Sequence, residues 1–77
     1  MTTVMTNEMQ FKDRLRLLRE MSGLTQSELA RKAGCEPSNI AHMEAGRREP
    51  NFANLVKIVK ALGISADVLL GTARHAG

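Results

Sequence analysis

Apolar residues recur at intervals of three and four along most of the chain, which is the spacing of one face of an α-helix. Glycines and a proline divide the pattern into five segments, and no segment alternates apolar and polar residues as a half-buried strand does. The pattern therefore predicts an all-α fold, a compact bundle of five short helices. These are expected at residues 7–22, 26–33, 37–45, 52–62 and, for a short last helix, between Ser65 and Gly71.

The ends of these segments carry residues that start and stop helices. Thr25, with Glu28 three positions later, has the sequence of a capping box, in which each residue satisfies a free backbone N–H of the other. Pro37 suits the first position of a helix because its missing N–H is not needed there. Asn51 and Ser65 are suitable N-caps. Each segment is followed by a glycine, the residue that most often ends a helix: Gly23, Gly34, Gly46, Gly63 and Gly71.

The apolar stripes of the five segments predict the hydrophobic core. Its expected members are Phe11, Leu15, Leu18 and Met21, then Leu29, Ala30 and Ala33, then Ile40 and Met43, then Phe52, Leu55, Ile58, Val59 and Leu62, and finally Val68, Leu69 and Leu70. Basic residues cover much of the remaining surface of the first segment. Among them, Arg14 and Arg16 are expected either to reach an anionic partner or to remain in solvent.

Length and composition bound the class of protein. A chain of 77 residues is expected to form one domain, close to the lower size limit for unaided folding. Cys35 is the only cysteine, so it is expected to be a small, partly buried residue in a reducing compartment, and zinc-site spacing is absent. We expect no signal peptide and no transmembrane segment. Residues 1–8 are expected to be a flexible N-terminus, 9–71 the folded domain, and 72–77 a short tail in which His75 has no role.

The linker between the second and third segments is only three residues long. Gly34, Cys35 and Glu36 must turn the chain abruptly there, and glycine adopts the left-handed backbone conformation that such a turn needs. Two short helices joined in this way are typical of a helix-turn-helix. The pattern alone leaves three interpretations open: binding of DNA, binding of another protein, or a purely structural role.

The predicted outer face of residues 37–45 favours DNA among these interpretations. It is built from small or short polar residues with no carboxylate at its centre, and such a helix fits a major groove about 12 Å wide. Phosphate-binding candidates flank it, at the N-terminus of the second helix and directly after the third. The net charge of +3 permits an anionic partner without requiring one. Triads, paired carboxylates and glycine-rich phosphate loops are absent, so we expect no enzyme activity, no cofactor and no metal site.

Three stretches, "LTQSELARKAG", "SNIAHMEAGRREPN" and "LVKIVKALGISADVLLG", carry a resemblance that covers about residues 9–71. Together they resemble the Cro/cI-type helix-turn-helix family, also called the Xre family, to which phage repressors, restriction–modification controllers and many antitoxins belong. The resemblance implies a five-helix, lambda-repressor-like DNA-binding domain. It also implies a cytoplasmic protein, encoded by a bacterium or a phage and associated with the nucleoid when bound.

The resemblance implies roles for particular residues. The third helix would be the recognition helix, with base-facing positions at Glu36, Pro37, Ser38 and His42. Phosphate contacts would come from Thr25, Gln26, Asn39, Arg47 and Arg48, and Gln26 would also buttress the recognition helix. Arg19 and Glu44 would form a structural ion pair between the first and third helices.

The chain departs from the family at the start of the recognition helix. Relatives often carry a glutamine where Pro37 stands, and such an amide reads adenine through two hydrogen bonds. Proline has no donor, and Glu36 before it repels phosphate but accepts from cytosine. We therefore expect direct readout from Ser38, His42 and Glu36, with a large share of specificity from DNA shape.

The function predicted from these residues is sequence-specific binding of double-stranded DNA by a homodimeric transcriptional repressor. One helix pair makes few contacts, and two-fold pairing doubles them, so we expect an inverted-repeat operator with half-sites about 34 Å apart. The expected dimer interface contains Ile64, Val68 and Leu69. Neither a small-molecule effector nor a membrane is implied. The alternative is a protein-interaction module, such as the antitoxin of a toxin–antitoxin pair.

Overall fold

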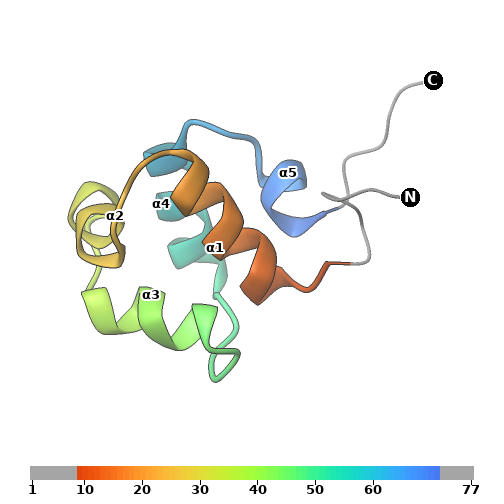
Figure 1. Cartoon of the computed structure of the whole chain (residues 1–77), viewed down its shortest axis with the longest axis horizontal. Helices are drawn as coiled ribbons and strands as arrows, with labels where there is room; N and C mark the ends of the chain where they lie inside the picture. The colour runs from red at the N-terminus through yellow and green to blue at the C-terminus, as the bar shows by residue number, and fades with distance from the viewer. Residues whose placement is uncertain (1–8, 72–77) are drawn as a thin grey trace.

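The computed structural model describes residues 9–71 and has five α-helices in that part of the chain (Figure 1). They are α1 (Phe11–Met21), α2 (Gln26–Ala33), α3 (Pro37–Glu44), α4 (Phe52–Leu62) and α5 (Ala66–Leu70). The described residues contain no strand, so the predicted all-α, five-helix fold is confirmed. The expected flexible N-terminus, the short tail and His75 lie outside the described residues.

The helix boundaries follow the predicted signals closely, with one exception. Residues 26–33 and 52–62 are helical as expected, and α3 ends one residue early, with Ala45 as its C-cap. The first helix was expected from residue 7 but begins at Phe11, after Gln10. Gln10 makes no side-chain capping hydrogen bond, so no capping residue in the sequence marks this position as the start of a helix.

Short-range interactions fix both the start of α2 and the turn from α2 to α3. Thr25 Oγ1 accepts from Glu28 N at 3.0 Å, and Glu28 Oε1 accepts from Thr25 N at 2.8 Å, which completes the predicted capping box. Gly34 ends α2 in the left-handed conformation, with φ of +76°. Cys35 N then donates to Ala30 O at 2.9 Å. The chain therefore turns within three residues, and α3 begins at Pro37.

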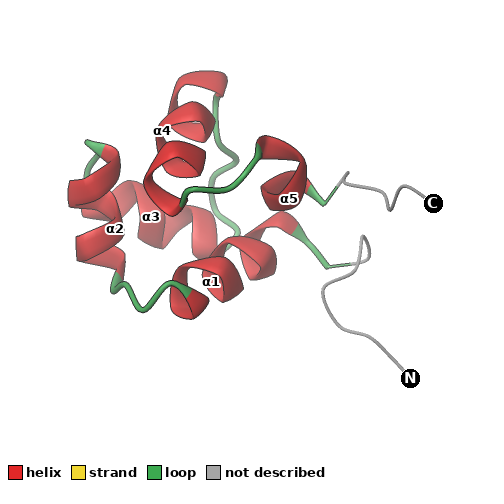
Figure 2. Cartoon of the chain, turned by 90° about the horizontal axis from the view of Figure 1, so that it is seen from above, coloured by secondary structure: helices red, strands yellow, loops and turns green. Residues whose placement is uncertain are grey.

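The core lies where α1, α2, α3, α4 and α5 meet, and its largest fully buried side chains come from every helix: Leu15, Leu29, Ile40, Met43, Ile58 and Leu69. The helix α3 packs on α2 and α1, α2 also packs on α4, and α5 packs on α1 and α4 (Figure 2). Two fully buried side chains on the inner face of α3, Ile40 and Met43, set the rotation of that helix about its axis. The opposite face of α3 is therefore directed away from the bundle.

Three residues predicted for the core are exposed instead. Met21 is 69% exposed, Phe52 is 79% exposed and Leu70 is 42% exposed. Each is the first or last residue of its helix, where the helical face extends past the neighbouring helices that would cover it. The apolar periodicity is correct for these helices, but periodicity carries no information about where the packing partner ends.

Arg14 lies in neither of the two places expected for it. Its side chain is neither solvent-exposed nor available to an anionic partner, because Arg14 is only 3% exposed. The guanidinium donates through Nη2 to the carbonyl of Met9 and lies against Gly71, where an added Cβ would overlap it. Arg14 therefore packs the two ends of the described chain against each other, and Gly71 provides the space for it.

Candidate nucleic-acid interface

No other helix of the described residues covers the outer face of α3 (Figure 1). In Figure 1, α3 runs along the edge of the bundle opposite α5, with no helix beyond it. Pro37 and Ser38 are exposed, as is Glu36 before them, while Asn39 and His42 are half-buried. Glu36 is the N-cap of α3 but makes no side-chain capping hydrogen bond. Glu36, Pro37 and Ser38 are therefore accessible at the start of α3, and Asn39 and His42 are partly accessible.

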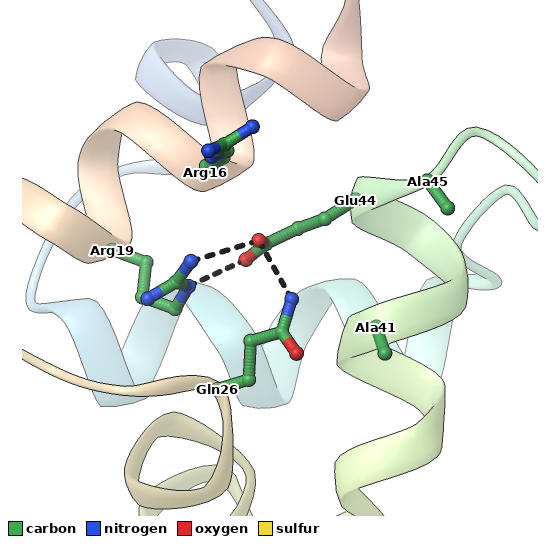
Figure 3. A pocket seen from close by; sticks show the side chains of 6 residues that line it. All are labelled: Arg16, Arg19, Gln26, Ala41, Glu44 and Ala45. Atoms are coloured by element: carbon green, nitrogen blue, oxygen red, sulfur yellow. Dashed lines mark hydrogen bonds and ion pairs between the residues drawn. The ribbon is translucent and has the colours of Figure 1, made fainter.

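Glu44, the last residue of α3, joins three helices. Its carboxylate accepts from Arg19 Nε at 2.6 Å and from Arg19 Nη2 at 2.9 Å. Gln26 Nε2 donates to the same carboxylate at 3.0 Å (Figure 3). The side chain of Glu44 is 4% exposed and that of Arg19 is 11% exposed. This buried, bidentate pair is of the stronger kind, and it holds α3 to α1 and to the start of α2.

Arg19 is held from a second side. Its Nη1 donates to the carbonyl of Leu24 at 2.8 Å, in the turn that leads to α2. The hydrogen bond with Glu44 raises the pKa of Arg19, and this effect outweighs burial, which lowers it. The guanidinium therefore stays charged at every pH at which the protein is expected to work. The ion pair implied by the resemblance is present in the structure, with a deeper burial than sequence spacing could indicate.

Gln26 and Thr25 lie where the sequence placed them, at the start of α2, but each also has a partner within the chain. The amide of Gln26 is committed to Glu44 through one of its two N–H groups. It lines an open hollow together with Arg16, Arg19, Ala41, Glu44 and Ala45 (Figure 3). Thr25 uses its hydroxyl oxygen to cap α2. The buttressing contact of Gln26 is thus a feature of the structure, and its phosphate contact stays a prediction.

Arg47 and Arg48 contact side chains of α3, which the sequence did not indicate. Arg47 Nε donates to His42 Nδ1 at 3.2 Å, and Arg48 Nη1 donates to Asn39 Oδ1 at 3.1 Å. Both arginines are exposed. From the sequence, both arginines were predicted only to contact phosphates. Gly46 could have indicated these contacts, because a helix that ends in a left-handed residue returns the following side chains toward its last turn.

The predicted dimer residues do not all lie on an accessible surface. Ile64 and Val68 are half-buried and pack against the core, while Leu69 is fully buried, so Leu69 as an interface residue is a correction. Leu69 belongs to the core, on the helix α5 that packs on α1 and α4. The exposed apolar residue of α5 is its neighbour Leu70, which the sequence assigned to the interior.

The described residues show neither a candidate metal site nor a membrane-spanning helix. Within residues 9–71, no three histidine, cysteine or carboxylate residues lie close enough together to hold a metal ion. Cys35 is half-buried, and burial raises the pKa of its thiol, with a smaller opposing effect from Lys57. In the same part of the chain, no helix combines the length and apolar character that crossing a bilayer requires.

Comparison with known proteins agrees with this geometry. The profile of the helix-turn-helix family HTH_3 matches residues 15–69. Over 63 residues the chain is 38% identical to the cryptic phage CTXphi transcriptional repressor RstR of Vibrio cholerae, a match that covers 82% of this chain and 56% of that protein. The chain spans between 21% and 56% of the length of the curated relatives it matches.

Solved structures give the same result. The restriction-modification controller protein C.AhdI from Aeromonas hydrophila aligns with a TM-score of 0.74 and 37% identity, over 77% of this chain and 89% of that one. The P22 c2 repressor, solved in complex with a synthetic operator, aligns with a TM-score of 0.77 and 31% identity, over 84% of this chain and 98% of that one. The chain therefore belongs to the helix-turn-helix family of Cro/cI-type (Xre) DNA-binding transcriptional regulators.

Proposed function

We propose that this protein is a homodimeric transcriptional repressor that binds an inverted-repeat operator and places α3 in the major groove of each half-site. The observation that carries the proposal is the combination of a free outer face on α3 with a rigid attachment of the same helix through Glu44. A helix held at both its inner face and its end presents base-reading side chains in one orientation. This family of regulators is not an enzyme class.

The relatives support a role in DNA binding. RstR is a transcriptional repressor, and the P22 c2 repressor has been solved on operator DNA. Each is similar to this chain over most of the chain's length. We propose base contacts from Glu36, Pro37, Ser38 and His42. We propose phosphate contacts from Thr25, Gln26, Asn39, Arg47 and Arg48. The first two lie at the start of α2, Asn39 lies on α3, and the two arginines follow α3.

The dimer surface that we propose contains Ile64, Val68 and Leu70. The three residues lie on α5 and in the turn before it, and Leu70 is 42% exposed. In Figure 1, α5 lies at the other end of the bundle from α3. Two protomers joined there by a two-fold axis would leave both recognition helices free, and the pairing would double the number of base contacts.

Selection from random DNA duplexes, followed by sequencing, tests the proposal. We expect enrichment of an inverted repeat whose half-site centres lie about 34 Å apart along the duplex. Recovery of an unenriched pool, with binding that depends on salt but not on sequence, would contradict it.

A matched pair of variants ties the selected binding to α3. Ser38→Asp places a carboxylate at a proposed base-contacting position of α3 and should abolish selective binding, because the carboxylate cannot replace the hydroxyl as a donor and is repelled by the phosphates that border the groove. Lys60→Gln changes the net charge by the same amount on α4, at an exposed position, and should reduce affinity only slightly. Equal losses in the two variants would show that net charge, rather than α3, governs binding.

A further inference from the structure

The chain that leaves α3 folds back onto it. Gly46 has φ of +80°, and its N–H donates to Met43 O at 3.2 Å, while Arg47 N donates to His42 O at 2.9 Å. These two hydrogen bonds form a Schellman motif at the end of the helix. Arg47 is thereby fixed at its backbone next to His42, before its side chain makes any contact.

The side chain of Arg47 makes a second contact with the same residue. Its Nε lies 3.2 Å from His42 Nδ1. A guanidinium nitrogen only donates hydrogen bonds, so Nδ1 must be the unprotonated, accepting nitrogen of the ring. In a neutral imidazole the remaining proton is then on Nε2. His42 therefore presents an N–H donor on the side of the ring that faces away from Arg47.

We propose that Arg47 is a positioning residue that fixes His42 as a hydrogen-bond donor, and that His42 consequently selects guanine in the operator. The inference rests on the proposed function, because it assumes that α3 enters the major groove. Guanine presents two acceptors side by side there, O6 and N7, whereas cytosine presents only a donor, adenine has its N7 acceptor beside the N6 donor, and thymine has its O4 acceptor beside a methyl group. A fixed donor therefore distinguishes the two strands of a G·C pair.

The neighbouring arginine repeats the arrangement one turn earlier on the helix. Arg48 Nη1 donates to Asn39 Oδ1 at 3.1 Å, which leaves the amide nitrogen of Asn39 with both of its donors. An unconstrained asparagine reads adenine by using its oxygen and its nitrogen together. With its oxygen engaged by Arg48, Asn39 is a donor toward DNA. Asn39 and His42 thus both offer donors, under the control of two consecutive loop arginines.

A simple phosphate contact by Arg47 makes a different prediction. Loss of a phosphate contact weakens binding to all sequences alike, because phosphates carry no sequence information. Loss of a positioning contact relaxes preference at one base pair in each half-site. The two roles are therefore separable in one experiment.

The first measurement uses the free protein labelled with ¹⁵N. Long-range ¹H–¹⁵N spectra of the histidine rings are recorded at pH 8, at which free imidazole side chains are neutral. We expect His42 to carry its proton on Nε2, with Nδ1 shifted as a hydrogen-bonded acceptor. Arg47→Met should move the Nδ1 resonance toward that of an unbonded nitrogen, and Arg31→Met, which removes an exposed arginine of α2, should leave it unchanged. A proton on Nδ1, or equal effects of the two variants, would overturn the inference while leaving DNA binding intact.

The second measurement is the selection from random duplexes, repeated with variants. The parent should prefer guanine at one position per half-site by about tenfold. His42→Ala should remove that preference alone. Arg47→Lys keeps the charge but has a methylene where arginine has Nε, so it should retain most of the affinity and lose the preference. Arg31→Met should keep the preference.

The outcomes separate the inference from the function on which it rests. An Arg47→Lys profile identical to the parent, or a preference for cytosine or adenine at the position lost in His42→Ala, would overturn the guanine assignment while operator binding stands. Failure of the parent to enrich any sequence would overturn the proposed function, and with it the guanine assignment. The ring spectrum would still decide the orientation of His42 in that case.

Discussion

Gln26 and Glu44 are 18 residues apart in sequence and are joined by a hydrogen bond of 3.0 Å between Gln26 Nε2 and Glu44 Oε1. The bond connects the first residue of α2 to the last residue of α3. The same carboxylate is held by Arg19 of α1. The angle between the two helices of the helix-turn-helix is thus set at both ends, by the glycine turn at one end and by Glu44 at the other.

Replacing Glu44 with alanine should strongly destabilise the fold. Arg19, whose side chain is 11% exposed, would lose both of its hydrogen bonds to a carboxylate and keep only the more distant, exposed Glu20, and removal of one partner from a buried pair costs about 3–5 kcal/mol. Urea unfolding followed by circular dichroism measures this loss. A loss of this size would leave a small domain close to unfolded, since total stabilities are about 5–15 kcal/mol.

The matched control for this prediction is Glu20→Ala. Glu20 also lies near Arg19, with 3.9 Å between its Oε2 and Arg19 Nη2, but its side chain is 53% exposed. A surface pair of this kind contributes about 0–1 kcal/mol. Similar unfolding midpoints for the two variants would show that the contact with Glu44 is no stronger than a surface pair.

Gln26→Ala should weaken binding to all DNA sequences by a similar factor and leave sequence preference unchanged. The proposed contact of Gln26 is to a phosphate, and its second contact, to Glu44, only holds α3 in place. The stability should fall by about 0.5–1.5 kcal/mol, the net value of one hydrogen bond, because Glu44 keeps both bonds from Arg19.

Fluorescence anisotropy with the selected operator and with an unrelated duplex measures both affinities for Gln26→Ala. Gln26→Glu, which has the same shape, should lose more affinity and more stability, because it places a second carboxylate beside Glu44. A changed base preference in Gln26→Ala would contradict the phosphate assignment.

Leu70→Glu should weaken the proposed dimer. Leu70 is 42% exposed at the end of α5, so the substitution costs the monomer little, whereas a buried glutamate at an interface is left without a partner. We expect the dimer dissociation constant to rise by about tenfold or more in sedimentation equilibrium. Phe52→Glu is the control, since Phe52 is 79% exposed on α4. Dissociation caused by Phe52→Glu instead would move the interface to the start of α4.

Cys35 should react with iodoacetamide at a higher pH in the folded protein than in the unfolded chain. Burial raises the pKa of the Cys35 thiol, and only the thiolate reacts. The midpoint of the rate against pH, unlike the plateau rate, does not depend on steric access to the sulfur. Coincident midpoints for the folded protein and for the chain in urea would contradict the shift.

The same shift has a consequence for stability. Because the folded pKa of Cys35 lies above the unfolded value, the stability associated with the neutral thiol is fully present below the unfolded pKa and is lost as the pH rises through the folded pKa. Cys35→Ser should therefore make the alkaline loss of stability smaller, as measured by thermal unfolding between neutral and alkaline pH.

The sequence by itself determined the helices, their caps and the turn. Thr25 with Glu28, Gly34 and Pro37 act over three or four residues, so their effect is nearly independent of the rest of the chain. The apolar periodicity also identified the buried centre of each helix. The ion pair of Arg19 and Glu44 followed from the resemblance to a family, since no local pattern connects residues 25 positions apart.

Only the tertiary structure decided which side chains are accessible and which contacts they make. It buried Arg14 under Gly71, exposed Met21, Phe52 and Leu70 at helix ends, and enclosed Leu69 in the core. It also placed Arg47 against His42 through the Schellman turn. These features depend on where one helix ends relative to another. A helical period fixes the direction of a side chain around its own axis, but packing between helices fixes what that side chain meets.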